Sequence, residues 1–318
     1  FDGGPGRIEN LEHLALVGRG VVEHLFFRQG LAGFRHAGRI ADHPREIADQ
    51  EDHLMPQVLK VLQLLPGVQS GAEGSSGLYV RGGGPDQNLI LLDGVPVYNA
   101  SHLFGFFSVF NADAINHVEL VKGGFPARYG GRLSSVIDIR MKEGNSKKFQ
   151  GEGSIGLVAS RLTVEGPIAK DKTSFIVSGR RTYVDLLAAP LIKMSTEGEE
   201  TAGYYFYDLN AKINHRFNER NRLFLSMYTG DDKAYARSRY VIREDDNTSE
   251  SATQFKLQWG NITTALRWNA IINKKLFSNV TATYSRYRFG VYADQKESVT
   301  TSGVTQSEYF QTAYVSGI

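Results

Sequence analysis

Residues 77–96 read "GLYVRGGGPDQNLILLDGVP", two runs of strand-forming residues separated by a glycine-rich loop. A phosphate-binding P-loop ends in Gly-Lys-Ser/Thr and opens a helix, whereas this loop leads into the apolar run 89–92. The dinucleotide fingerprint fails as well, because Gln87 stands where its third glycine belongs. The stretch therefore predicts two strands joined by a hairpin connection with positive φ at the glycines 82–84, and a second turn at Asp93-Gly94.

The flanking sequence extends this pattern into a small mixed α/β unit. "MPQVLKVLQLLPGV" (55–68) predicts a short amphipathic helix that ends at Pro66-Gly67. The predicted buried face of this helix consists of Val58, Leu59, Leu62 and Leu65. Two further β-like runs follow, "INHVELVKGG" (115–124) and "LSSVIDIRMKEG" (133–144). Together these elements indicate an α+β domain over residues 55–146.

Residues 147–318 follow a different rule, an alternation of apolar and polar side chains. In "YFYDLNAKINHRFN" (205–218) the odd positions are mostly apolar, and the even positions from Asp208 to Arg216 are polar. "NITTALRWNAIIN" (261–273) alternates in the same way. Each run therefore predicts a strand with one apolar face and one polar face. From Tyr284 to Val291 the apolar residues shift from one parity of positions to the other, and a bulge or an aromatic girdle would each explain this shift.

The connections between these runs alternate in length. Three are tight (169–172, 218–221 and 273–275), and three are long and polar (184–203, 236–257 and 295–306). Outer-membrane barrels have short turns on one side and long loops on the other, and their strands have about ten residues. The alternation favours such a barrel, while a soluble β-sandwich stays open as the alternative.

Composition excludes several classes of protein. The 318 residues carry a net charge of +2, which gives no bulk reason to expect nucleic acid as a partner. There is no cysteine and no apolar run of transmembrane-helix length. The chain begins without Met, without a signal-peptide pattern, and ends within a strand-like run, so we expect a fragment.

Residues 1–54 differ from the rest of the chain. Residues 1–59 contain six Arg, no Lys and five of the eight His, and none of these His has metal-site spacing. Residues 8–27 have roughly helical apolar spacing. Two interpretations stay open for this segment: one or two helices, or a misread or unrelated stretch.

The chain resembles the TonB-dependent outer-membrane receptors in three segments of their plug domain. These are "LKVLQLLPGVQ" (59–69), "LYVRGGGPDQNLILLDGVPVYN" (78–99) and "NHVELVKGGFPARYGGRLSSVIDIRMKEG" (116–144). The resemblance covers residues 55–318 and leaves out the first 54. It implies a plug followed by the first strands of an antiparallel transmembrane β-barrel, incomplete at about eight of about 22 strands.

The resemblance also implies the site residues. Arg81 and Lys122 are expected to pair with carboxylates on the inner barrel wall and hold the plug shut, so Arg81→Ala should raise passive leakage. The family pattern has Arg-Gly-Pro where this chain has Lys122-Gly123-Gly124, which weakens two-pronged pairing there. Gly82, Asp93 and Gly94 match turn positions of the plug motifs. Glu119, Arg128 and Tyr129 match further motif positions, and their expected role is folding of the plug.

The implied function is ligand-gated, energy-coupled import of a scarce solute across the bacterial outer membrane. The implied partners are the inner-membrane coupling protein TonB, a small imported ligand of unknown type and outer-membrane lipid, without nucleic acid. No enzyme, cofactor or metal motif occurs, so no catalysis is expected. Two alternatives stay open: a passive porin-like or adhesin barrel, and a soluble β-sandwich that binds a ligand.

Overall fold

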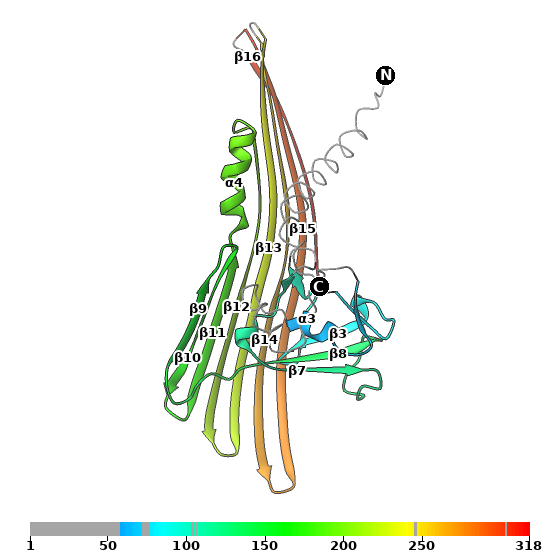
Figure 1. Ribbon diagram of the computed structural model, residues 1–318, viewed down its shortest axis with the longest axis vertical. Coiled ribbons are helices and arrows are strands. Elements are labelled where there is room, and N and C mark those ends of the chain that lie inside the picture. The colour runs from blue at the N-terminus through cyan, green and yellow to red at the C-terminus, as the bar shows by residue number, and fades with distance from the viewer. Residues whose placement is uncertain (1–57, 72–76, 103–104, 106, 245–246, 303) are drawn as a thin grey trace, which may run out of the picture.

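The computed structural model describes residues 58–71, 77–102, 105, 107–244, 247–302 and 304–318. Two parts are visible in Figure 1, a small mixed domain and a tall curved sheet against which it lies. We call residues 58–141 the plug and strands β9 to β16 the wall. The predicted segment 1–54 lies outside the described residues, and so do the helices expected within it.

The plug is built on a four-stranded mixed sheet of order β4-β3-β8-β7. Strand β3 pairs parallel with β8, and β7 pairs antiparallel with β8. The residues of β8 are almost all buried, as expected for a central strand covered on both faces. The elements of the plug are α3 (Val58–Gln63), β1 (Val68–Ser70), β2 (Leu78–Val80), η2 (Pro85–Gln87), β3 (Asn88–Leu92), β4 (Val95–Pro96), β5 (Ser101–His102), β6 (Phe107–Ser108), η4 (Ala112–Ala114), β7 (Ile115–Lys122) and β8 (Ser135–Met141).

The predicted amphipathic helix forms and covers this sheet. Leu59 and Leu62 are buried in α3 and pack in one core with Ile137 and Ile139 of β8. Leu65, predicted on the same face, lies beyond the end of the helix and is 39% exposed. Tyr228 of the wall belongs to the same buried core, so the plug and the wall share apolar packing.

The glycine-rich loop is a tight turn, but the hairpin predicted around it is wrong. Arg81 and Gly82 both have positive φ (49° and 84°) between Val80 and Gly83, whose backbones exchange hydrogen bonds, which is a type I′ turn. The strands it was expected to join do not pair, since β2 pairs with β1 and β3 with β8 and β4. The short helix η2 redirects the chain after the turn.

The second predicted turn joins two paired strands. Asp93 and Gly94 have φ of 50° and 86° and connect β3 to β4. Aspartate is among the few residues other than glycine that adopt this conformation readily.

The wall is one antiparallel meander of eight strands in chain order, from β9 to β16. Its elements are β9 (Gln150–Ile155), β10 (Ala159–Ala169), β11 (Thr173–Thr182), α4 (Val184–Ser195), β12 (Glu200–Asn218), β13 (Asn221–Glu244), β14 (Asn247–Asn273), β15 (Leu276–Thr301) and β16 (Val304–Gly317). The α+β plug followed by an antiparallel barrel sheet is the predicted fold class. The boundary falls in the segment between Met141 and Gln150.

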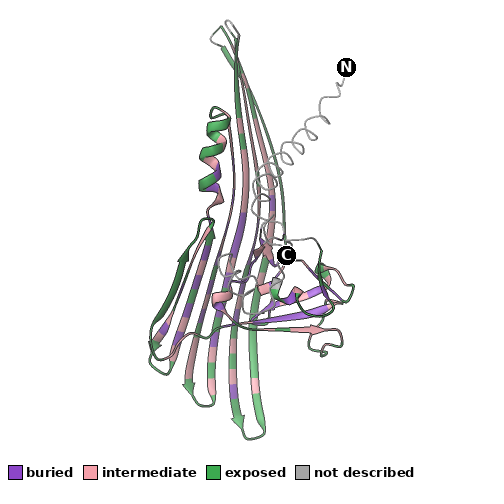
Figure 2. Ribbon diagram, viewed as in Figure 1, coloured by how far each residue is buried: buried purple, intermediate pink, exposed green. Residues whose placement is uncertain are grey.

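The two faces of the wall reverse the burial pattern of a soluble protein. On β12 the polar residues Asp208, Asn210 and Lys212 are buried, at 2%, 1% and 5% exposure, against the plug. The apolar neighbours Leu209 and Ile213 are exposed, at 40% and 41%. Figure 2 shows this alternation of buried and exposed residues along the lower strands. An apolar face turned outward suits lipid, and a soluble sandwich requires the opposite.

Two of the predicted long loops are strand extensions instead. Strands β13, β14 and β15 run for 24, 27 and 26 residues, far beyond the roughly ten that cross a bilayer. Figure 1 shows them rising above the plug as a narrow ribbon. Polar cross-strand contacts such as Arg239 to Glu250, 2.8 Å apart, replace the apolar pattern that the prediction required. The third predicted loop, 184–203, contains helix α4 and the start of β12.

The tight connections appear where the sequence predicted them, and all lie at the end of the wall away from α4 (Figure 1). The parity change near Tyr284 is not a bulge, because the pairing of β14 with β15 is regular there. Among the described helices, none is long and apolar enough to cross a membrane.

Candidate functional site

The contact between plug and wall is polar and centres on His102, at the end of β5. Its Nε2 lies 2.8 Å from Asp208 Oδ1 on β12, and its Nδ1 lies 2.5 Å from Asp232 Oδ2 on β13. The ring stacks on Phe206 with the centroids 4.0 Å apart and the planes 5° from parallel. One plug side chain thus joins two neighbouring strands of the wall.

The carboxylate of Asp208 is the most heavily used group at this contact. Besides His102, it accepts hydrogen bonds from Arg180 on β11, with Nε 2.9 Å away, and from the Tyr228 hydroxyl at 2.9 Å. Arg180 also donates to the carbonyl oxygen of Ser108 in the plug at 2.7 Å. The hydroxyl of Tyr204 donates to Asp232. We call His102, Arg180, Tyr204, Asp208, Tyr228 and Asp232 the imidazole cluster.

Charges in the imidazole cluster balance only if the imidazole is protonated. A neutral ring has one acceptor nitrogen, which would face a carboxylate unfavourably, whereas imidazolium donates from both nitrogens. Burial lowers the pKa of His102, but the facing carboxylates Asp208 and Asp232 raise it more, so the pKa lies above its ordinary value of 6.5. His102 and Arg180 then match the two aspartates.

This raised pKa predicts a pH dependence of the plug–wall contact. Its stabilisation should be fully present below pH 6.5, the ordinary value, and should be lost as the pH rises through the raised pKa of His102. In model compounds, carboxylates and guanidinium groups keep their charges over this range, and tyrosine hydroxyls stay neutral through most of it. Unfolding midpoints of the full-length receptor across this range measure the effect.

The variant His102→Gln supplies the control for this prediction. It retains a side chain that forms hydrogen bonds but has no titrating group. Its midpoint should therefore lack the His102-dependent part of the decline. A wild-type profile that superimposes on that of His102→Gln would contradict the protonated contact.

A second charged contact lies nearer the tight turns. Lys212 on β12 has its Nζ 3.0 Å from Asp93 Oδ2, and both side chains are almost completely buried. The same Nζ donates to the carbonyl oxygen of Met141 at 3.1 Å. Arg267 on β14 donates to the backbone oxygen of Asp93 at 2.7 Å. We call Asp93, Lys212 and Arg267 the lysine cluster.

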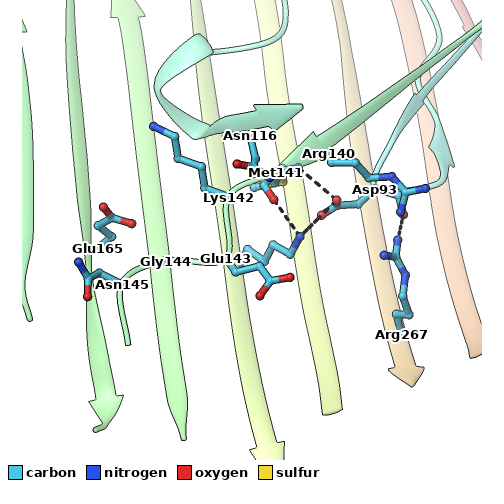
Figure 3. A pocket seen from close by; sticks show the side chains of 11 residues that line it. Asp93, Asn116, Arg140, Met141, Lys142, Glu143, Gly144, Asn145, Glu165 and Arg267 are labelled. Atoms are coloured by element: carbon cyan, nitrogen blue, oxygen red, sulfur yellow. Dashed lines mark hydrogen bonds and ion pairs between the residues drawn. The ribbon is translucent and has the colours of Figure 1, made fainter. Parts of the chain in front are cut away.

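A polar cavity of about 660 Å³ opens beside the lysine cluster, between the end of β8 and the wall. Figure 3 shows Arg267 directed at Asp93, with Glu143 and Glu165 farther along the lining. The lining includes Asp93, Arg140, Lys142, Glu143, Glu165, Lys212 and Arg267. Water can therefore reach the edge of this contact.

Further hydrogen bonds fasten the plug along its length. Asn111 Nδ2 donates to Ser178 Oγ at 2.7 Å, and Ser285 Oγ donates to the Pro96 carbonyl at 2.7 Å. Arg161 on β10 lies 3.3 Å from Asp113 in η4. The plug is thus bound to β10, β11, β12, β13, β14 and β15.

The structure places the predicted latch residues away from these contacts. Within the described residues the exposed side chain of Arg81 forms no ion pair; it lies beside Gly123, where an added Cβ would be 3.2 Å from Nη1. Lys122 Nζ donates to the carbonyl oxygen of Pro66 at 2.7 Å, inside the plug. Neither contacts a carboxylate of β9–β16, so the predicted pairing has no support from these strands.

The other predicted positions lie at turns and on the plug surface. Gly82, Gly94 and Gly123 have positive φ. Arg128 donates to the Tyr129 hydroxyl at 2.9 Å, and that hydroxyl lies 3.5 Å from Asp138 Oδ2. Glu119 is exposed on β7. Of the predicted site residues, Asp93 is the one that meets the wall through an ion pair.

Sequence reasoning missed His102, Arg180, Asp208, Lys212 and Asp232. A usable signal was present for two of them, because Asp208 and Lys212 lie on the polar parity of a strand whose other parity is apolar. In an outer-membrane strand that parity faces the interior. Charged residues there need partners, and the nearest candidates are on the plug.

The comparisons with known proteins agree with this architecture. Residues 46–136 match the model of the TonB-dependent receptor plug domain. This part of the chain is similar to the plug domains of the TonB-dependent receptors. The match begins at residue 46, so the expectation that the first 54 residues take no part is wrong for residues 46–54. A plug domain of this kind indicates a protein of the bacterial outer membrane.

Two curated relatives are transporters or receptors of this kind. The vitamin B12 transporter BtuB of Vibrio vulnificus (strain CMCP6) is 28% identical over 181 residues, which cover 55% of this chain and 27% of that protein. The ferrienterobactin receptor of Escherichia coli K12 is 29% identical over 140 residues, covering 38% and 18%. The receptor chain thus spans about a quarter or less of these relatives.

Solved structures of siderophore receptors are also similar to the receptor chain. PirA from Pseudomonas aeruginosa has a TM-score of 0.41 and 16% identity, with 85% of this chain and 51% of that chain covered. PirA from Acinetobacter baumannii has a TM-score of 0.42 and 15% identity, with 83% and 55% covered.

Proposed function

We propose that this receptor imports a scarce solute through the barrel, and that the plug closes the path until energy from TonB displaces it. The observation that carries the proposal is the position of the plug, bound to the inner polar face of the wall by buried ion pairs. Ligand binding on the side of the long hairpins then signals that the plug is to be moved.

The chemistry of the contact suits a plug that must detach and return. A buried ion pair gains little net free energy over water, because each charge loses its hydration. When TonB pulls the plug and water enters, Asp208, Asp232 and Lys212 recover that hydration. An apolar contact of equal area would resist separation more strongly, at about 25 cal/mol per Å².

The two alternatives account less well for the geometry. A passive porin or an adhesin has no need of a mixed domain held against the inner face by matched charges. A soluble sandwich requires the apolar parity of the strands to face a core, yet Leu209, Ile213 and Leu225 are exposed at 40%, 41% and 43%.

The substrate class follows from neither the cavity nor the relatives. The relatives named above take vitamin B12 in one case and ferrienterobactin in the other. The exposed residues of the long hairpins, such as Arg239 and Tyr240, are compatible with several ligand chemistries. The proposal is therefore limited to a scarce solute that needs active import.

Uptake by cells that express the full-length receptor tests the proposal. Labelled vitamin B12 and ferric enterobactin serve as first probes, in cells with and without TonB. We expect at least one probe, or a member of a wider panel of metal chelates, to enter only when TonB is present and to bind equally in both strains. Entry of small solutes at the same rate with and without TonB, and without surface binding, would favour the passive barrel.

A further inference from the structure

The outward face of the wall carries an apolar band that ends at a row of charged and aromatic residues. Along β12 the band runs from Ile213 to Leu209, and the next outward residue is Tyr207. The exposed apolar residues of the band are Val177, Leu209, Ile213, Leu225, Met227, Ile262, Leu266 and Trp268. Such a band matches the lipid-facing surface of an outer-membrane barrel.

The row at the edge of the band is continuous across five strands. Arg181 pairs with Tyr207, Tyr207 with Asp231, Asp231 with Gly260, and Gly260 with Arg288. Residues directly opposite each other in an antiparallel sheet share a face. The row therefore crosses β11 to β15 at one height, on the side of the band toward the long hairpins.

Basic residues predominate at this height. We call Arg181, Lys233, Lys256, Arg286 and Arg288 the outer basic patch. Arg181 and Arg288 lie in the row itself. The other three occupy outward positions two or four residues along their strands from it. Two carboxylates offset part of this charge: Asp231 accepts bonds from Arg288 at 2.7 Å and Tyr207 at 2.8 Å, and Asp185 of α4 pairs with Arg181 at 3.4 Å. The patch thus has a positive excess.

The basic side chains are arranged along the surface. The Tyr205 ring lies between two of them, with Arg181 Cζ 4.9 Å and Lys233 Nζ 5.8 Å from its centroid. Half of the Arg181 side chain is exposed, and Arg286 is exposed as well. Tyrosine rings at the edge of an apolar band are typical of the membrane interface, and the long basic side chains reach the polar side from there.

We propose that the outer basic patch binds the phosphate groups of anionic lipids in the leaflet on the long-hairpin side. Guanidinium groups match phosphate with two parallel hydrogen bonds, and Lys233 adds a point charge. The apolar band lies next to the patch on the same strands, so the acyl chains of one lipid contact the band while its headgroup meets the patch. This site does not depend on the transported solute.

The test compares the full-length receptor with the triple variant Lys233→Gln, Lys256→Gln and Arg286→Gln. This variant leaves Arg288 paired with Asp231 and Arg181 paired with Asp185, so no buried carboxylate loses its partner. The control variant Arg239→Gln, Arg243→Gln and Lys296→Gln removes three charges from the long hairpins, well beyond the band. Heat-modified mobility on gels reports whether each variant has a folded barrel.

Lipid binding is measured in detergent micelles by native mass spectrometry, with a lipid that has a phosphate monoester headgroup and with phosphatidylcholine. We expect the wild type and the control variant to bind the monoester lipid, and the triple variant to bind it at least tenfold more weakly. Phosphatidylcholine should show little difference between the three proteins. Equal binding of the monoester lipid by the folded triple variant, or its displacement by an equal concentration of inorganic phosphate, would overturn the proposal.

Discussion

Asp208→Ala should destabilise the receptor by about 3–5 kcal/mol, the usual cost of removing one partner from a buried ion pair. Its side chain is completely buried and binds His102, Arg180 and Tyr228. Without it, the imidazole cluster holds two cations, His102 and Arg180, and the one carboxylate of Asp232. Urea unfolding of the full-length receptor in detergent micelles measures the loss, and we expect the plug to detach before the barrel unfolds.

A charge-balanced variant separates electrostatics from packing in this prediction. Asp208→Asn combined with Arg180→Gln leaves His102 and Asp232 as a matched pair, so it should recover part of the stability lost in Asp208→Asn alone. Glu219→Ala, an exposed carboxylate in a tight turn, should change stability by less than about 0.5 kcal/mol. A loss in the double variant equal to the sum of the two single losses would show that the charges do not act together.

Lys212→Met should loosen the plug and raise passive leakage of small antibiotics, because it leaves the carboxylate of Asp93 buried without its cation. Methionine retains most of the apolar stem, so the loss reports on the charge. Asp93→Asn tests the same contact from the plug side, and asparagine tolerates the positive φ of 50° at this position. The double variant should show a coupling of about 1–3 kcal/mol between the two sites.

Arg81→Ala is the matched control for this second prediction. Arg81 is an exposed plug cation at a turn, whereas Lys212 is buried, and no ion pair joins Arg81 to the described residues of β9–β16. The geometry therefore predicts leakage close to that of the wild type. Higher leakage in Arg81→Ala than in Lys212→Met would favour the contact predicted from the sequence over the lysine cluster.

Local features of the plug could be predicted because they depend on neighbours in the chain. The pattern of Leu59 and Leu62 predicted a helix, and both leucines are buried in α3. Asp93-Gly94 predicted a turn, and both residues have the positive φ that such a turn needs. The pairing around Gly82 was wrong because partner choice in a mixed sheet depends on strands about fifty residues apart, such as Asn88 and Ser135.

The long hairpins show a second limit of prediction from sequence. Residues 236–257 and 295–306 are polar on both faces, so the alternation that identifies a lipid-facing strand ends there. Strand pairing continues regardless, because backbone hydrogen bonds and diagonal cross-strand ion pairs such as Arg239 with Glu250 need no apolar face. Polarity alone therefore does not separate a loop from a strand that extends into water.

The sequence by itself determined the succession of a mixed plug and an antiparallel sheet, the places of the tight turns and the two parities of the strands. These properties repeat over two to four residues, so a window of sequence contains them. The tertiary structure decided which charges meet. His102 lies 106 residues from Asp208 and 130 from Asp232 along the chain. Only the placement of the plug on the inner face brings them together, and a charge buried there depends on partners within the protein.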